Sequence, residues 1–232
     1  MKYLSRKRFK YILLIVALMI IVVSLIVKRS QESDSKCRVP KPSATYALAS
    51  ELLCGLVVKE EHFGVPYERE LFSYGRDSDG DGQSTRSEIL LRDSTVEVQF
   101  GYRNGIPFIV SGAWLSPLDA TSYSASSDVE VDHLVPLKEA WDSGAWRWSS
   151  DELRSFANDL EYPTLIVVST SMNRSKGQKD FAEWAPDNAK CWYAQMWILV
   201  KFRWNLAVDV LEKNALAEAL DGDCGSISLK VN

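Results

Sequence analysis

The chain has 232 residues, of which 46% are hydrophobic and 25% are charged, and it is rich in Trp, Tyr and Phe. This composition excludes a disordered or fibrous protein and predicts one packed domain with accessory segments. Residues 1–29 hold seven of the 27 basic residues and none of the 31 acidic ones, so the remainder carries 20 basic residues and a net charge of -11. Such a domain cannot attract nucleic acid by bulk electrostatics.

The N-terminus contains an apolar run at residues 11–27 that is interrupted only by Ser24. Its 17 residues are at the short end for a membrane-spanning helix but long for a signal peptide, and no clear small-x-small cleavage site follows. We therefore expect one N-terminal transmembrane helix, with a cleaved export signal as the alternative. Because basic residues concentrate before the run, residues 1–10 are predicted to form a cytoplasmic tail, with everything after the run outside.

The rest of the chain divides into a stalk with a short helix, residues 28–62, and a domain, residues 63–232. Apolar spacing predicts that the short helix begins near Ser43. The domain is predicted to be α+β, with an additional hairpin turning at Asn104-Gly105 and helices concentrated toward the C-terminus. The expected elements, in chain order, are strands within 96–114, a strand at 129–134, a helix at 149–160, a strand at 164–169, a helix starting within 171–184, and helices at 187–204 and 208–220.

Four cysteines fit an oxidising compartment, and they allow three pairings. We expect Cys37 to pair with Cys54, which closes a short loop, and Cys191 to pair with Cys224, which ties a helix to the C-terminal tail. The chain-entropy estimate for each bond is about 3–4 kcal/mol.

One of the two histidines, His133, follows Asp132 at the end of a predicted strand, and Asn173 lies about 40 residues later, after the second predicted strand. A carboxylate and an amide oxygen can hold one oxygen-preferring cation, and a neighbouring imidazole can act as a base. That combination suits metal-assisted hydrolysis of a phosphodiester.

Three segments carry a resemblance: residues 132–148 (DHLVPLKEAWDSGAWRW), 156–160 (FANDL) and 173–180 (NRSKGQKD). They closely resemble small secreted bacterial HNH endonucleases of the ββα-metal, or His-Me finger, superfamily. The resemblance spans roughly Phe72 to Cys224. It implies a ββα-metal (HNH) core and an exported endonuclease that hydrolyses DNA, with RNA as the alternative substrate. With the N-terminal segment as anchor, it implies a bacterial cell-membrane protein, or a secreted one after cleavage.

Carried over residue by residue, His133 matches the general base, Asp132 the metal ligand before it, and Asn173 the second ligand. The resemblance implies Mg²⁺, with Mn²⁺, Ca²⁺ and Zn²⁺ as alternatives, and a departing 3′ oxygen stabilised by that cation. The family's middle asparagine orders the loop between the strands. Thr164 corresponds to it here, and Asn158 is the nearest asparagine upstream, which leaves two candidates for that brace.

A dense basic cluster, Arg174, Lys176 and Lys179, lies beside Asn173 and could contact nucleic acid locally; a solvated basic loop is the alternative. Arg86 is a further candidate contact at the rim of the active site.

The acidic segment 77–88 matches a calcium-binding EF-hand loop through Asp77, Asp79, Asp81 and Glu88. Ser84 stands where paired loops carry an apolar residue, and there is no second loop. A turn held by Asp side chains and a structural calcium site are therefore both open. The alternative function from another class is a non-enzymatic, calcium-stabilised binding module on the cell surface. A toxin or restriction nuclease with the same domain is less expected, and the sequence suggests no protein partner.

Overall fold

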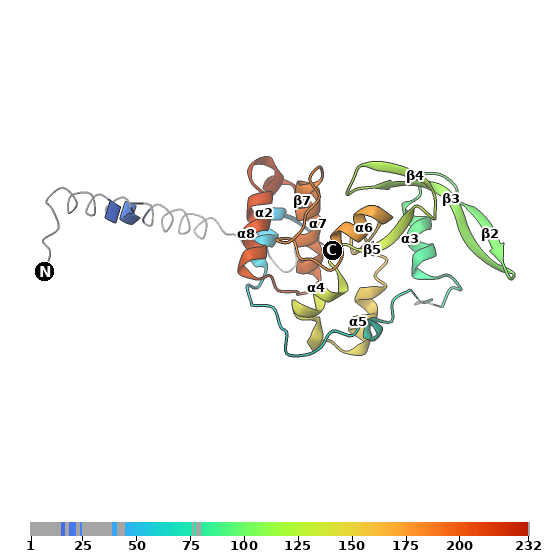
Figure 1. Cartoon of the computed structure of the whole chain (residues 1–232), viewed down its shortest axis with the longest axis horizontal. Coiled ribbons are helices and arrows are strands. Elements are labelled where there is room, and N and C mark those ends of the chain that lie inside the picture. The colour runs from blue at the N-terminus through green and yellow to red at the C-terminus, as the bar shows by residue number, and fades with distance from the viewer. Residues whose placement is uncertain are drawn as a thin grey trace, which may run out of the picture. The chain divides into compact units, whose positions relative to one another are not determined.

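The computed structural model describes residues 15–16, 19–21, 24, 39–40, 45–75, 77 and 80–231. The chain divides into two units, Met1–Arg38 and Val39–Asn232. The second unit mixes helices with three small sheets (Figure 1), which confirms the predicted α+β class. The predicted transmembrane span, 11–27, falls mostly outside the described residues. Within the described part of the chain, no helix is long and apolar enough to cross a bilayer.

In the described residues, seven strands form three antiparallel sheets, with the orders β1-β7, β2-β3-β4 and β5-β6. The strands are β1 (Tyr46–Leu48), β2 (Gln99–Arg103), β3 (Ile106–Ser116), β4 (Thr121–Ala125), β5 (Val129–His133), β6 (Leu165–Ser169) and β7 (Ser228–Lys230). The helices are α2 (Ala49–Gly55), α3 (Thr85–Asp93), α4 (Leu137–Asp142), α5 (Ser150–Ala157), α6 (Thr170–Lys176), α7 (Lys190–Arg203) and α8 (Val210–Ala219), with short 3-10 turns η1 (Arg69–Phe72), η2 (Ala145–Arg147) and η3 (Gly222–Ser226).

Several local predictions are confirmed. The hairpin between β2 and β3 turns at Asn104 and Gly105, whose φ angles of 54° and 78° are the left-handed values that a tight hairpin turn requires. Ser149 caps α5 by accepting a hydrogen bond from the backbone N–H of Glu152. The predicted strands at 129–134 and 164–169 are β5 and β6.

The first helix differs from its prediction. It begins at Ala49, and the residues before it, Tyr46–Leu48, form β1, which pairs with β7 at the other end of the chain. Ser43, the expected cap, lies outside the described residues. Pairing between chain ends so distant in sequence leaves no local pattern, and a three-residue strand is too short to show alternation.

The β5-β6 pair lies between two hydrophobic clusters. Val131 and Val167 pack with α3 and β3 on one face, while Ile166 and Val168 join the larger cluster formed with α4, α5 and α7. Because both faces are covered, every residue of β6 is buried. In Figure 1, α2, α7 and α8 gather at one end of this unit and β2–β4 at the other, with β5 and α6 between them.

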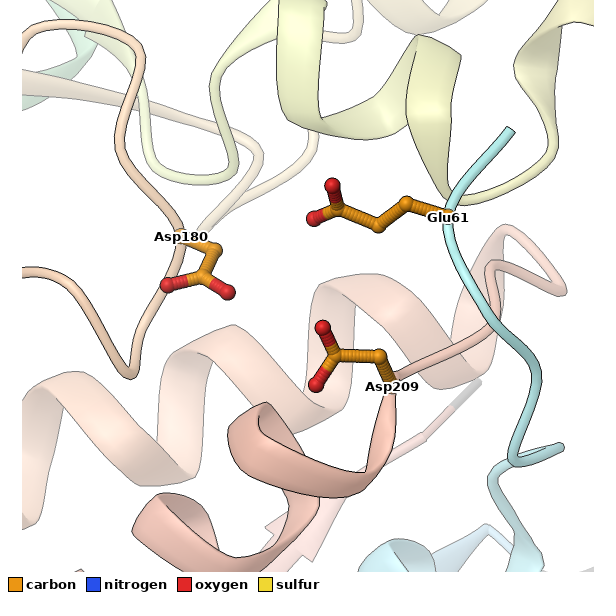
Figure 2. Close-up of side chains that lie close together, drawn as sticks. All are labelled: Glu61, Asp180 and Asp209. Atoms are coloured by element: carbon orange, nitrogen blue, oxygen red, sulfur yellow. The ribbon is translucent and has the colours of Figure 1, made fainter. Parts of the chain in front are cut away.

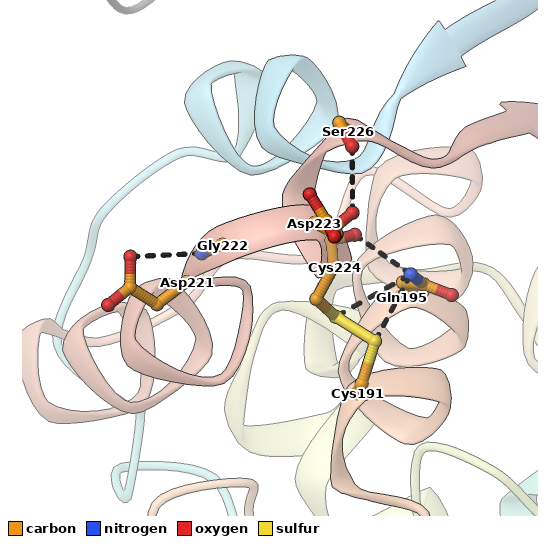
Figure 3. The surroundings of a disulfide bond; sticks show 7 residues. All are labelled: Cys191, Gln195, Asp221, Gly222, Asp223, Cys224 and Ser226. Carbon is orange, nitrogen blue, oxygen red and sulfur yellow. Dashed lines mark hydrogen bonds between the residues drawn. A yellow bond between two sulfur atoms is a disulfide. The ribbon is translucent and has the colours of Figure 1, made fainter.

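A disulfide joins Cys191 at the start of α7 to Cys224 in η3, which confirms the second predicted pairing. Figure 3 shows Gln195 beside it, where the side-chain amide donates to the carbonyl oxygen of Cys224 at 2.8 Å. No free cysteine remains in the described part of the chain. Cys37, the expected partner of Cys54, lies outside that part.

Candidate active site

The site forms where β5 ends and α6 begins its first turns. Successive residues of a strand point to opposite faces, so Glu130 and Asp132 share the face of β5 that lies toward α6, while His133 points the other way. Helix α6 follows β6 directly because Ser169 ends the strand and caps the helix, accepting a hydrogen bond from the backbone N–H of Met172. Strands β5 and β6 are separated in the chain by α4, η2 and α5 but pair with each other, and α6 follows β6, so Asp132, His133 and Asn173 come to one cavity.

His133 is buried, with 4% of its surface exposed. Its Nε2 lies 3.0 Å from the carbonyl oxygen of Ala157, and its ring contacts Tyr74 and Phe156. Because a carbonyl oxygen only accepts hydrogen bonds, Nε2 carries the proton and Nδ1 the lone pair. Burial lowers the pKa of His133 to about 3, and the nearby charge of Lys176 acts in the same direction. The imidazole is therefore neutral at physiological pH.

Asp132 forms an ion pair with Lys176, whose Nζ lies 2.9 Å from Oδ2. The same Nζ donates to the carbonyl oxygen of His133 at 2.8 Å. Burial raises the pKa of Asp132, and the Lys176 charge opposes that rise. The Lys176 side chain is fully buried, so its predicted contact with a nucleic acid at the surface is wrong. Its partners are the last two residues of β5.

Asn173 donates a hydrogen bond from its side-chain amide to the carboxylate of Glu130. This contact leaves the amide oxygen of Asn173 available as an acceptor. Glu130 was missed in the sequence, although its position two residues before Asp132 on a strand was the signal that could have found it.

A cavity of about 220 Å³ opens at this point. Asp132, His133 and Asn173 all line it, so the structure brings these three residues together. Two cations that the sequence did not single out, Arg69 of η1 and Lys138 of α4, line it as well. The cavity therefore combines a neutral imidazole, oxygen donors and positive charge.

The loop between β5 and β6 is held by both candidates for the brace. Asn158 accepts hydrogen bonds from the Thr85 hydroxyl at 2.8 Å and the Gly75 backbone N–H at 3.0 Å, which ties the loop to α3 and to the segment after η1. The Thr164 hydroxyl donates to Asp159 at 2.6 Å within the loop itself. Asn158 thus makes the long-range connection, and it directly follows Ala157, whose carbonyl holds His133.

The other residues predicted to contact nucleic acid differ in their exposure and in their partners. Arg174 and Lys179 are exposed on and just after α6. The guanidinium of Arg86 donates to the carbonyl oxygens of Ser126 and Val129 at 2.8 and 3.2 Å, so it fastens the turn before β5. Its role in the structure is to hold that turn.

The acidic segment forms a turn followed by α3. Both carboxylate oxygens of Asp77 accept backbone N–H groups, from Gly80 at 2.7 Å and Gly82 at 2.9 Å, and Asp81 accepts the backbone N–H of Gln83 at 2.7 Å. These bonds are those of a turn held by Asp side chains. Glu88 lies in the first turn of α3, and Asp79 is outside the described residues. Calcium binding here stays a prediction.

A second group of carboxylates, which the sequence did not reveal, joins three distant segments. Figure 2 shows Glu61, Asp180 and Asp209 facing one another, and their oxygens lie within 4.8 Å. Asp180 accepts the backbone N–H of Glu183, and Asp209 caps α8. Burial, together with nearby carboxylates, raises the pKa of Glu61 to about 7. The group therefore carries fewer than three negative charges near neutral pH.

Comparison with known proteins gives two matches. A family model described as the C-terminal domain of GmrSD restriction endonucleases matches residues 86–219, a span that includes Asp132, His133, Asn158 and Asn173. An "Uncharacterized secreted protein" of Arthroderma benhamiae is 40% identical over 182 residues, which are 78% of this chain and 86% of that protein. No solved structure matches.

These matches correct the predicted location. The relative is fungal and is named a secreted protein, which contradicts the prediction of a single-pass protein of a bacterial membrane. The family description supports the predicted endonuclease class, and restriction endonucleases were among the classes weighed from the sequence. With more than half of its length matched, the chain belongs to the family of GmrSD restriction endonuclease C-terminal domains.

Proposed function

We propose that this protein is an exported, metal-dependent endonuclease of the HNH type that hydrolyses phosphodiester bonds of DNA, with RNA as the alternative substrate. The observation that carries the proposal is the shared cavity, which Asp132, His133 and Asn173 line together at the end of β5 and on α6. The order β5, β6, α6 matches the ββα core that the sequence resemblance implies. The name of the fungal relative supports export.

The donors around the cavity fit a hard divalent cation. Asp132 offers a carboxylate and Asn173 an amide oxygen, and Glu130 adds a second carboxylate next to Asn173. All are oxygen ligands of the kind that Mg²⁺ and Mn²⁺ prefer, and Mg²⁺ is the ion we propose. Such a cation, when bound, would offset negative charge on the scissile phosphate and the leaving oxygen.

His133 is suited to act as the general base. Its contact with the Ala157 carbonyl fixes the proton on Nε2 and leaves Nδ1 to accept a proton from water. The low pKa keeps the imidazole neutral across the physiological range. The surrounding rings of Tyr74 and Phe156 fix the plane of the imidazole, which keeps its lone pair in one direction.

Substrate capture has to be local because the chain after residue 29 has a net charge of -11. Arg69 and Lys138 line the cavity, so we propose that they bind the phosphates next to the scissile bond. Arg174 and Lys179, exposed near α6, are proposed to contact the backbone farther along.

The test is cleavage of a supercoiled plasmid by the purified protein with Mg²⁺ or Mn²⁺, with and without EDTA. We expect EDTA-sensitive loss of supercoiled DNA. His133→Ala should lower the rate at least about 100-fold, since general-base catalysis is typically worth 10²–10⁴-fold. The matched control is His62→Ala. His62 is the other histidine of the chain, stacks on Trp146 at 4.0 Å and does not line the cavity.

His62→Ala is expected to retain the wild-type rate. Retained cleavage by folded His133→Ala would reject the role of His133. If the wild-type protein cleaves neither DNA nor RNA with any divalent cation, the endonuclease proposal fails and the calcium-stabilised binding module becomes the better explanation.

A further inference from the structure

Lys176 is a buried cation at the very point where the proposed metal ligands meet. Its side chain is fully buried, and its Nζ contacts Asp132 Oδ2 at 2.9 Å and the His133 carbonyl oxygen at 2.8 Å. Burying an ammonium group is costly unless it is paired, so these two contacts fix where the group lies. Both belong to the last two residues of β5.

The position of Lys176 on α6 explains why it reaches this point. It lies three residues after Asn173, and residues at i and i+3 share one face of a helix. The same face of α6 therefore presents one proposed metal ligand, Asn173, and one fixed positive charge to Asp132. The neighbours Arg174 and Lys179 are exposed instead.

A fixed ammonium group beside Asp132 has two opposite effects on a divalent cation. It orients the carboxylate, which favours binding. It also lies 2.9 Å from the buried oxygen Oδ2 and repels a second positive charge, which disfavours binding. Strand β6 and helix α6 already hold β5 in place, so orientation by Lys176 adds little and we expect repulsion of the cation to dominate.

We propose that Lys176 is a positioning residue that competes with the divalent cation for Asp132 and so keeps cation affinity low until the phosphates of a substrate add their negative charge. This inference rests on the proposed function. It predicts that removal of the Lys176 charge makes the substrate-free protein bind its cation more tightly while the protein without a cation becomes less stable.

The experiment measures Mn²⁺ binding by calorimetry, without nucleic acid, for wild type and Lys176→Met. We expect at least tenfold tighter binding by Lys176→Met, together with a larger rise in its melting temperature on addition of Mn²⁺. The double variant Asp132→Asn, Lys176→Met should lose this increase in Mn²⁺ affinity, which would show that the increase depends on Asp132. Lys201→Met is the matched control, since Lys201 is likewise fully buried but pairs with Glu139 and Glu212. It should be destabilised without tighter binding at Asp132.

Unchanged or weaker binding by Lys176→Met would overturn the proposal, because a purely structural lysine predicts that result. If Lys176→Met is unfolded without a cation, its folded fraction is titrated with Mn²⁺ by circular dichroism. Folding that returns with Mn²⁺ supports the proposal, and folding that does not return overturns it. Wild-type binding that Asp132→Asn does not reduce would instead reject the metal site of the proposed function.

Discussion

The end of α5, which carries the Ala157 carbonyl, is tied to distant segments by the buried side chain of Asn158, and Asn158→Ala tests how much that side chain contributes. Asn158 is 6% exposed. It accepts hydrogen bonds from Gly75 and Thr85 and donates to the carbonyl oxygen of Arg154 at 2.9 Å and, more weakly, to that of Ser73 at 3.4 Å. The substitution removes all four bonds at once.

The expected loss in the free energy of unfolding follows from the polar groups that the substitution leaves without a hydrogen-bond partner. The Gly75 N–H and the Thr85 hydroxyl lose their shared acceptor, and an orphaned buried donor costs about 1–3 kcal/mol. The Gly75 N–H is only partly buried and a Thr hydroxyl hydrogen is free to rotate, so we take the low end for each. Loss of the donor to Arg154 adds about 1 kcal/mol. We expect the free energy of unfolding to fall by about 3 kcal/mol and the melting temperature by about 6–12 °C.

The assay is urea unfolding followed by circular dichroism, with the disulfides kept oxidised. Asn214→Ala is the matched control, because Asn214 is exposed on α8 and should change the free energy by less than about 0.5 kcal/mol. At 25 °C, where Asn158→Ala stays folded, nuclease activity should also fall because the carbonyl that orients His133 loses its support. A loss of less than about 1 kcal/mol would refute the assignment of Asn158 as the brace.

Three further changes have defined outcomes. The pKa of Glu61 is raised to about 7, so the folded state holds a proton that the unfolded carboxyl releases. The free energy of unfolding therefore falls as the pH rises from about 4.5 to 7. In urea unfolding at pH 5 and 8, Glu61→Gln should remove about 1 kcal/mol of that fall, after allowance for solvent screening. Replacing Cys191 and Cys224 by Ser opens a loop with a separation of 33 residues and should cost about 3–4 kcal/mol in the same assay. Lys201→Met leaves two buried carboxylates without their cation and should cost about 3–5 kcal/mol, whereas a melting temperature equal to that of the wild type would contradict the ion pairs.

Local signals carried most of the correct predictions. The Ser149 cap, the Asn104-Gly105 turn and the β-branched run of β6 act over a few residues, so they are visible in the sequence. The features that were missed depend on distant segments. The pairing of β1 with β7 and the group of Glu61, Asp180 and Asp209 exist only after the chain has folded.

The site shows the same division between features visible in the sequence and features that depend on packing. Asp132, His133 and Asn173 were predicted because segments 132–148 and 173–180 resemble those of HNH endonucleases. Arg174, Lys176 and Lys179 are all basic in the sequence. Which of them is buried depends on how α6 is rotated against β5, and this rotation buries Lys176. Spacing alone could have placed Glu130 beside Asp132, but which charges face each other required the packing of α6.

The charges at the end of β5 also explain how an acidic protein could act on a polyanion. Asp132 pairs with the buried Lys176, and Glu130 accepts a hydrogen bond from Asn173, so two carboxylates lie near one ammonium group where a divalent ion would bind. Arg69 and Lys138 lie on the cavity wall, where a phosphate entering the site would meet them. Because screening acts over about 8–10 Å in physiological salt, these nearby charges outweigh the distant surface charges that make up the net -11. Substrate affinity should therefore follow the cation concentration more closely than the overall charge of the protein.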